Sequence, residues 1–215
     1  MARSSVGRRV TSNRSLVLRF VLAGSLVLLW LAGFLLGTGE LDLAVLGALY
    51  SGDRPVLADT ARLVTMLGGW YFVTPLAAVA GLVVALRGKP WPGLVLFVGS
   101  LVGRLLVELQ KYQLGRVRPD EHPHLVNVYN LSFPSGHSAN AMMVYVAMAL
   151  MLVEGDRRNL WLGAALVLST LIGLSRMMLG VHWPSDVLAG WSFGLLWAML
   201  LAWLSGHPPA WAVRR

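Results

Sequence analysis

Residues 187–205 read VLAGWSFGLLWAMLLAWLS, a stretch that is almost entirely apolar and contains no charge. A helix of this length spans a bilayer, since about 20 apolar residues cover the hydrocarbon core. The whole chain agrees, because 13% of its 215 residues are charged and its mean hydropathy is +0.65. A soluble domain carries about 25% charged residues. The sequence therefore predicts an integral membrane protein.

Five more apolar stretches precede this one, at Phe20–Leu36, Leu63–Leu86, Pro90–Gly103 (continuing past Arg104 to Val107), Ser138–Val153 and Asn159–Ser175. The stretch Leu63–Leu86 is long enough to span the membrane at a tilt. The other four reach spanning length only if polar residues at their ends are included. We therefore predict an all-α fold, a polytopic membrane helix bundle with six transmembrane helices that forms one domain over residues 1–215. The mixed segment 39–61 is predicted to be an external loop with one or two short helices lying at the interface.

Basic residues flank these stretches at Arg3, Arg8, Arg9, Arg14, Arg19, Arg87, Lys89, Arg157, Arg158, Arg214 and Arg215. With six spans, all of these cations fall on one side of the membrane. The positive-inside rule then places both termini in the cytoplasm, with residues 1–14 as a basic cytoplasmic N-terminus of a cell inner membrane protein. The net charge of +8 is explained by this topology, and its distribution argues against a nucleic-acid partner.

Three polar clusters interrupt the apolar sequence: Lys111 with Arg118-Pro119, then Pro134-Ser135-Gly136-His137, then Ser175-Arg176 with His182 and Asp186. A charge in mid-membrane costs about 2.5–3.5 kcal/mol, so charges gathered at the ends of spans indicate function. The first two clusters separate the third and fourth spans, and the last cluster separates the fifth and sixth. All three therefore face the side opposite the N-terminus, where they can form one extracytoplasmic site.

The residue types in these clusters suit phosphate chemistry. Ser135, Gly136 and His137 stand where the fourth span begins, and a helix N-terminus binds anions through its free N–H groups. Glycine lets the backbone approach a phosphate closely. The cations match the charge of a phosphomonoester, and the planar fork of arginine suits its oxygens. These cations are Lys111, Arg118 and Arg176.

The pair His182 and Asp186 is spaced four residues apart around Pro184, at a predicted first turn of a helix. At this spacing the carboxylate reaches one imidazole nitrogen and holds the other toward a substrate. A histidine oriented by an acid is a nucleophile or a base. His137 is then free to protonate a leaving oxygen.

The order and spacing of the clusters resemble the complete tripartite signature of the type 2 phosphatidic acid phosphatase superfamily. The matching residues are Lys111-(six residues)-Arg118-Pro119, Pro134-Ser135-Gly136-His137 and Ser175-Arg176-(five residues)-His182-(three residues)-Asp186. The resemblance implies that His182 forms a phosphohistidine, that Asp186 orients it and that His137 is the general acid. It further implies that no metal or other cofactor is needed and that the phosphate is held by Lys111, Arg118, Ser135, Gly136 and Arg176.

With only residues 120–133 between its first two motifs, the chain resembles bacterial membrane phosphatases that act on phosphatidylglycerophosphate or undecaprenyl diphosphate. We therefore expect a hydrolase of lipid phosphates, with a slight preference for the polyprenyl diphosphate because the site faces outward. One alternative is a phosphotransferase that moves phosphate from a polyprenyl diphosphate to another lipid. Another is a non-catalytic lipid transporter, although transporters tend to carry ionisable groups near mid-membrane.

Other polar residues receive structural interpretations. Arg104 and Glu108 lie four residues apart within the third span, so an ion pair is expected, and a role in positioning Lys111 is the alternative. His122 and His124 have no companion ligands nearby, so a loop or headgroup role is favoured over metal binding. No catalytic part is expected for His207. Glycine pairs that allow close helix packing occur at Gly99/Gly103 and Gly190/Gly194.

Overall fold

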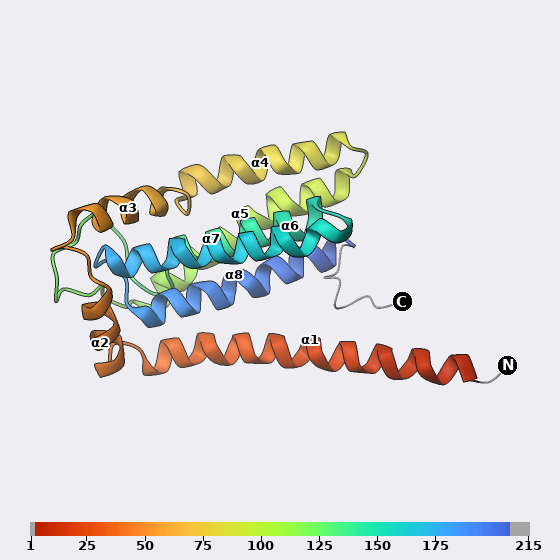
Figure 1. Ribbon diagram of the computed structural model, residues 1–215, viewed down its shortest axis with the longest axis horizontal. Coiled ribbons are helices and arrows are strands. Elements are labelled where there is room, and N and C mark those ends of the chain that lie inside the picture. The colour runs from red at the N-terminus through yellow and green to blue at the C-terminus, as the bar shows by residue number, and fades with distance from the viewer. Residues whose placement is uncertain (1–2, 207–215) are drawn as a thin grey trace.

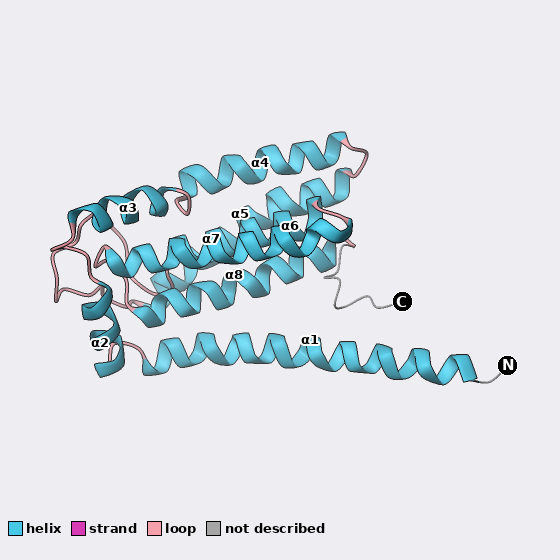
Figure 2. Cartoon of the chain, in the orientation of Figure 1, coloured by secondary structure: helices cyan, strands magenta, loops and turns pink. Residues whose placement is uncertain are grey.

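The computed structural model describes residues 3–206, and within that range it contains helices and loops but no strand (Figures 1 and 2). The predicted all-α class is therefore confirmed. The helices are α1 (Arg3–Leu36), α2 (Glu40–Leu49), α3 (Pro55–Met66), α4 (Trp70–Leu86), α5 (Pro90–Leu114), α6 (Gly136–Leu152), α7 (Arg158–Met178) and α8 (Pro184–Leu204), with a 3₁₀ turn at Gly155–Arg157. The predictions for His207, Arg214 and Arg215 fall outside the described residues.

Five of the six predicted spans coincide with single helices, whereas Leu63–Leu86 covers the end of α3, a break and α4. The count of six spans is not confirmed. Within the described residues, four helices are long and apolar enough to cross a membrane, namely those at Val17–Leu36, Pro90–Leu114, Gly155–Met178 and Pro184–Leu204. A fifth span results if α3 and α4 count as one span bent by 40°. Helix α6 is apolar but has only 17 residues. The segment 39–61 contains α2 and the first part of α3, in agreement with the expected short helices.

The long helices lie along one axis and alternate in direction, so the connections gather at two ends (Figure 1). One end holds α2, α3, the loop 115–135 and the turn 179–183. The other end holds the beginning of α1, the turn between α4 and α5 and the turn between α6 and α7. The three sequence clusters therefore lie at the same end, opposite the beginning of α1, as their positions along the chain predict.

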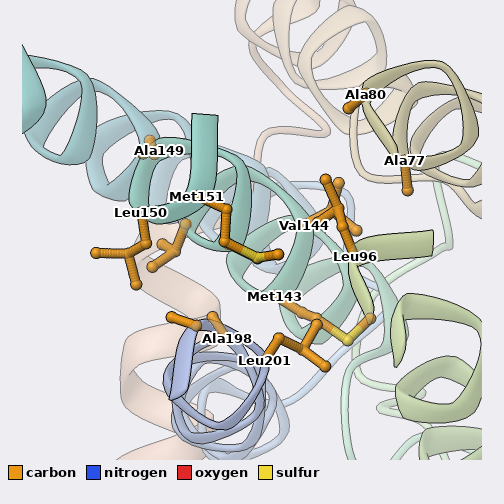
Figure 3. Close-up of a cluster of buried hydrophobic side chains, with 14 of the residues drawn as sticks. Ala77, Ala80, Leu96, Met143, Val144, Ala149, Leu150, Met151, Ala198 and Leu201 are labelled. Carbon is orange, nitrogen blue, oxygen red and sulfur yellow. The ribbon is translucent and has the colours of Figure 1, made fainter. Parts of the chain in front are cut away.

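Helix α6 lies at the centre of the bundle and contacts α4, α5, α7 and α8. Its side chains are buried over nearly its whole length, and residues such as Met143, Val144 and Leu150 form the main apolar core with Leu96 of α5 and Leu201 of α8 (Figure 3). A helix surrounded by protein can be apolar on all faces without reaching lipid. This central position explains why α6 carries no amphipathic pattern in the sequence.

The predicted close packing at the glycine pairs is present in the structure. A Cβ atom added to Gly190 would lie 2.6 Å from the carbonyl oxygen of Ser135, and one added to Gly194 would lie 2.5 Å from that of Ala139. At Gly103 it would lie 2.6 Å from Nε1 of Trp197. Because Gly190 and Gly194 have no side chains, the backbone of α8 touches the backbone of α6 at these two positions. This contact brings the beginnings of both helices together, and both carry predicted site residues.

We predict that Gly194→Val destabilises the protein, because the added side chain has no room against the backbone of α6. Overpacking of this kind typically costs about 1–3 kcal/mol, so the melting temperature in detergent should fall by several degrees. The matched control is Gly163→Ala on α7, where an added Cβ meets nothing within 4 Å. The control should melt at the wild-type temperature or slightly higher, since alanine favours helix. Equal melting temperatures for the two variants would contradict this account.

Candidate active site

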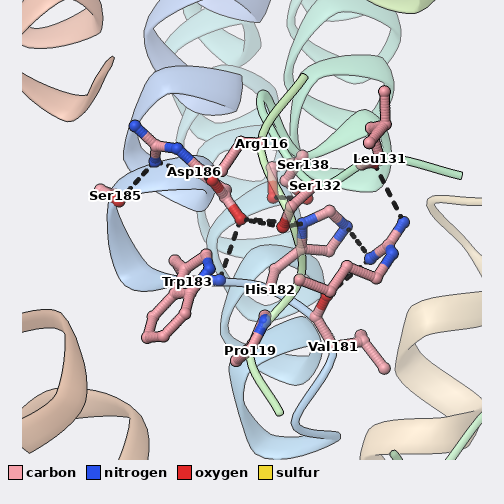
Figure 4. Close-up of polar contacts among 12 residues, drawn as sticks. Arg116, Pro119, Leu131, Ser132, Ser138, Val181, His182, Trp183, Ser185 and Asp186 are labelled. Atoms are coloured by element: carbon pink, nitrogen blue, oxygen red, sulfur yellow. Dashed lines mark hydrogen bonds and ion pairs between the residues drawn. The ribbon is translucent and has the colours of Figure 1, made fainter. Parts of the chain in front are cut away.

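His182 and Asp186 are held at the start of α8, which begins at Pro184. Pro184 fixes the first helical turn, so Asp186 points back along the helix toward the residues before it. Oδ2 of Asp186 accepts a hydrogen bond of 3.0 Å from the backbone N–H of Trp183 and lies 3.3 Å from Nδ1 of His182 (Figure 4). The carboxylate therefore caps the helix and orients the imidazole at the same time.

The hydrogen bonds of His182 define its tautomer. Nη1 of Arg118 lies 3.1 Å from Nε2 of His182, and a guanidinium can only donate. Nε2 is therefore the acceptor, and the ring proton is on Nδ1, facing Asp186. Burial lowers the pKa of His182 well below 6.5, and the charges of Arg118, Lys111 and Arg176 lower it further. The ring is thus neutral at neutral pH, with a lone pair on the nitrogen that faces the cations.

Two residues that the sequence interpretation missed complete the environment of Asp186. The hydroxyl of Ser132 donates to Oδ2 of Asp186 and lies 3.3 Å from Nδ1 of His182. Nη1 of Arg116 donates to Oδ1 at 3.0 Å, in an ion pair whose side chains are 9% and 0% exposed. Arg116 could have been found by the criterion applied to Arg118, because it is another cation at the edge of an apolar stretch. Nothing in the sequence distinguishes Ser132 from other loop serines.

Arg116 also connects this pair to α1. Its Nη2 donates to the carbonyl oxygens of Gly33 and Phe34 at 2.9 and 2.7 Å. These carbonyls belong to the last turn of α1, where helical carbonyls lack partners within the helix. The guanidinium also lies 4.3 Å from the ring centroid of Phe133. One arginine thus binds the end of α1 to the beginning of α8.

Helix α2 is joined to the same point through Asp42. Its Oδ1 accepts the backbone N–H of Ser185 at 3.0 Å, and its Oδ2 accepts the Ser185 hydroxyl at 2.5 Å. The same hydroxyl accepts a hydrogen bond of 2.9 Å from Arg116. Asp42 therefore caps α8 from another helix and takes part in the network around Asp186.

The three predicted phosphate-binding cations are held mainly by neutral oxygens. Arg118 donates to the backbone and side-chain oxygens of Asn130 at 2.7 and 2.8 Å, and Nζ of Lys111 donates to the carbonyl oxygen of Leu131 at 2.9 Å. Burial lowers the pKa of Arg118 to about 10, so the guanidinium is still charged at neutral pH. The positive charge at this point is therefore available to an incoming anion.

Arg176 on α7 carries an unsatisfied donor. One terminal nitrogen donates to the hydroxyl of Thr65 at 2.9 Å, but Nε is buried and has no partner among the described residues. A buried polar group without a partner is uncommon and costs about 1–3 kcal/mol. An oxygen of a bound anion would satisfy it.

The beginning of α6 faces these cations. Ser135 is the N-cap residue of α6, and its backbone N–H donates to the carbonyl oxygen of Asp186 at 3.0 Å. The atom nearest to a Cβ added at Gly136 would be Cε of Lys111 at 3.8 Å, so the backbone of this turn is open toward the lysine. His137 lies close enough to Arg176, Lys111 and Arg118 to interact electrostatically. Its ring makes no hydrogen bond with a described residue.

The predicted ion pair between Arg104 and Glu108 is wrong. The guanidinium of Arg104 lies 4.8 Å from the ring centroid of Trp70, because the first residue of α4 offers an aromatic face that a cation can cover. Oε2 of Glu108 instead accepts a hydrogen bond of 3.4 Å from the side-chain amide of Asn130. The alternative, a role in positioning Lys111, stays a prediction.

The histidines of the loop 115–135 have structural contacts. The ring of His122 stacks on that of Tyr50 at 4.3 Å, and Nε2 of His124 lies 2.7 Å from the carbonyl oxygen of Pro119. No three His, Asp or Glu side chains in the described part of the chain are grouped so that they could hold a metal ion. The eight predicted site residues, by contrast, lie together at one end of the bundle.

The sequence was compared with known families and proteins. The model of the PAP2 superfamily matches residues 92–207. Phosphatidylglycerophosphatase B of Bacillus subtilis (strain 168) is 38% identical over 148 residues, which cover 66% of this chain and 72% of that protein. A lipid A 1-phosphatase of Rhizobium johnstonii is 34% identical over 52% of this chain, and an undecaprenyl-diphosphatase of Sulfolobus acidocaldarius is 30% identical over 47%. The matched regions span about half the length of these last two proteins, 47% and 50%.

The fold was compared with solved structures. It is similar to the crystal structure of the transmembrane PAP2-type phosphatidylglycerolphosphate phosphatase from Bacillus subtilis, with a TM-score of 0.77 and 34% sequence identity. That match covers 83% of this chain and 93% of the other. A second match, to LpxE of Aquifex aeolicus, has a TM-score of 0.62 at 23% identity and covers 77% of this chain and 96% of the other. This second likeness concerns the fold alone.

We predict that Arg116→Met strongly destabilises the protein. Removing one partner of a buried ion pair leaves an uncompensated charge, which typically costs about 3–5 kcal/mol. The melting temperature in detergent should therefore fall markedly. The matched control is Asp59→Asn, which removes an ion pair with Arg62 whose side chains are 69% and 43% exposed. The control should stay close to wild type, since exposed pairs contribute about 0–1 kcal/mol. A wild-type melting temperature for Arg116→Met would show that Asp186 does not depend on this arginine.

Proposed function

Because the chain belongs to the PAP2 superfamily of membrane lipid phosphatases, we propose that it hydrolyses a lipid phosphate or diphosphate through a phosphohistidine at the extracytoplasmic face of the membrane. The observation that carries this proposal is the state of His182. Its neutral ring is fixed by Asp186 on one side and presents an acceptor nitrogen to Arg118 on the other. Such a nitrogen is suited to attack a phosphorus atom that enters between it and the arginine.

The phosphate is bound by Lys111, Arg118 and Arg176 together with the N–H groups of the first turn of α6, which begins at Gly136 directly after Ser135. The unpaired Nε of Arg176 supports this assignment, since a phosphate oxygen would give it the partner that it lacks. These donors also stabilise the equatorial oxygens of the transferring phosphoryl group, where negative charge spreads in the transition state. Because the cations supply this neutralisation, the proposed cycle includes no metal ion.

The reaction has two steps. In the first, Nε2 of His182 forms a bond to phosphorus and the bond to the leaving oxygen breaks. His137, which enters this step as an imidazolium beside the bound phosphate dianion, donates a proton to that oxygen. In the second, His137 takes a proton from water as the water attacks phosphorus, and the bond to Nε2 breaks. Inorganic phosphate leaves and both histidines return to their starting states. Asp186 stays ionised throughout and stabilises the positive charge that develops on the ring of His182.

The substrate is proposed to be tethered to the membrane. All the proposed catalytic groups lie at one end of a bundle of apolar helices. If these helices span the membrane, this end lies where the phosphate of a lipid would be found. A hydrocarbon anchor concentrates the substrate in two dimensions and contributes binding energy that positions the phosphorus. The names of relatives support this class, since they include phosphatases of phosphatidylglycerophosphate, lipid A and undecaprenyl diphosphate.

We further propose that the chain crosses the membrane six times, with the bent pair α3–α4 as one span and the central helix α6 as another. Both termini are then cytoplasmic and the catalytic end faces outward. The distribution of charge supports this orientation, because Arg87, Lys89, Arg157 and Arg158 all lie near the end opposite the site.

We predict that His182→Ala loses at least about 10³-fold in kcat, because no other group can form the covalent intermediate. Wild-type protein mixed rapidly with a lipid labelled in its terminal phosphate should acquire an acid-labile label, and His182→Ala should not. The matched control is His122→Ala, which removes a loop histidine that stacks on Tyr50 and should still become labelled. Full turnover by His182→Ala would exclude the phosphohistidine mechanism.

The orientation can be tested with single cysteines, since the chain has none of its own. We predict that Asn127→Cys, in the loop between the first two motifs, reacts with an impermeant thiol reagent added to intact cells. Asp156→Cys, in the exposed turn between α6 and α7, should react only after the membrane is permeabilised. The reverse pattern would place the active site in the cytoplasm.

A further inference from the structure

A cavity of about 450 Å³ lies beside the phosphate-binding cations, between the last turns of α5 and the loop 115–135. Its polar lining consists of Glu108, Lys111, Tyr112, Arg118, Tyr129 and Asn130. The remaining lining residues are aliphatic. The volume falls within the range of ligand pockets, about 300–1,000 Å³. The cavity is therefore large enough for the headgroup of a lipid.

Lys111 and Arg118 belong both to the cavity wall and to the proposed phosphate site. Because Lys111 and Arg118 border the cavity, a phosphate held by these two cations can place its next chemical group there. The proposed mechanism does not otherwise use the cavity. We therefore expect the residues that line the cavity to contact the part of the substrate that is bonded to the scissile phosphate.

Glu108 places a carboxylate on this wall, one helical turn before Lys111. Its position is defined by the hydrogen bond from the amide of Asn130, whose own oxygen accepts a bond of 2.8 Å from Arg118. Glu108 is the acidic residue among those that line the cavity. A carboxylate accepts hydrogen bonds from hydroxyl groups and repels a second phosphate.

We propose that Glu108 is a specificity-determining residue that selects substrates whose scissile phosphate is bonded to a neutral, hydroxyl-bearing group such as a glycerol or a sugar. This inference rests on the proposed phosphatase function and narrows its substrate class. A diphosphate would bring its second phosphate beside Glu108, where like charges oppose binding. A glycerol in the same place would offer a hydroxyl to the carboxylate. The preference for a polyprenyl diphosphate drawn from the sequence is thereby reversed.

Two lipids distinguish these cases. In phosphatidylglycerophosphate a glycerol carbon follows the scissile phosphate, whereas in undecaprenyl diphosphate a second phosphate follows it. Phosphate release from both lipids is measured in one detergent, and the ratio of their kcat/KM values is compared between wild type and Glu108→Gln. Glutamine keeps an oxygen for Asn130 and removes only the charge.

We expect wild type to favour phosphatidylglycerophosphate, and Glu108→Gln to reduce that preference about tenfold, mainly by lowering KM for the diphosphate. Glu108→Asp retains the charge and should keep the wild-type preference. Glu121→Gln removes an exposed charge of the same loop outside the cavity and should leave the ratio unchanged.

The outcomes separate the two proposals. If wild type releases phosphate from neither lipid, the phosphatase function itself is wrong. If wild type hydrolyses both lipids but Glu108→Gln has the wild-type ratio, the role of Glu108 is excluded while the phosphatase function stands. A wild-type preference for the diphosphate would also exclude the proposed role of Glu108.

Discussion

The carboxylate of Asp186 is completely buried at the end of a bundle of apolar helices, where an uncompensated charge would cost several kcal/mol. Its two oxygens receive hydrogen bonds from Arg116, the hydroxyl of Ser132 and the N–H of Trp183, and Nδ1 of His182 faces one of them. Through these partners, separate segments are joined to Asp186. Arg116 is hydrogen-bonded to the end of α1 and to Ser185, and the Ser185 hydroxyl is in turn hydrogen-bonded to Asp42 of α2. This end of the bundle is therefore arranged around the requirement to satisfy one buried acid.

The cations near Asp186 divide into two roles according to their partners. Arg116 is neutralised by the carboxylate, so its charge serves the structure. Lys111 and Arg118 donate mainly to carbonyl oxygens, and Arg176 keeps an unpaired Nε. Neutral oxygens hold a cation in place without cancelling its charge. The site therefore keeps a positive field that suits the proposed binding of a phosphate. Burial lowers the pKa of His182 and this field lowers it further, so the ring is neutral, as its proposed role as nucleophile requires.

The loop 115–135 contacts both the cations proposed to bind phosphate and the cavity proposed to select the substrate. Its backbone oxygens at Asn130 and Leu131 fix the two cations, and its side chains line the cavity beside them. Asn130 contacts both Arg118 and Glu108, so the residue that holds a phosphate-binding group also holds the carboxylate proposed to select the headgroup. Under this proposal, changes in a short surface loop would alter specificity while the proposed nucleophile at the start of α8 stays in place.

The sequence by itself determined the helical class, the positions of the apolar helices and the shared end of the three motifs, and it predicted eight site residues that the fold brings together at this end. These follow from local properties, namely hydropathy, the order of spans and the spacing of His182 and Asp186 on one helical turn. The sequence did not predict the contact of Ser132 with Asp186, the ion pair between Arg116 and Asp186, or the proposed role of Glu108. Each of these depends on contacts between segments far apart in the chain. The expected pairing of Glu108 with Arg104 was wrong for the same reason, since Trp70 and Asn130 compete for these side chains from other elements. Which polar groups meet at a buried point is decided by packing, here by the glycines that let α8 touch α6, and no local pattern specifies that choice.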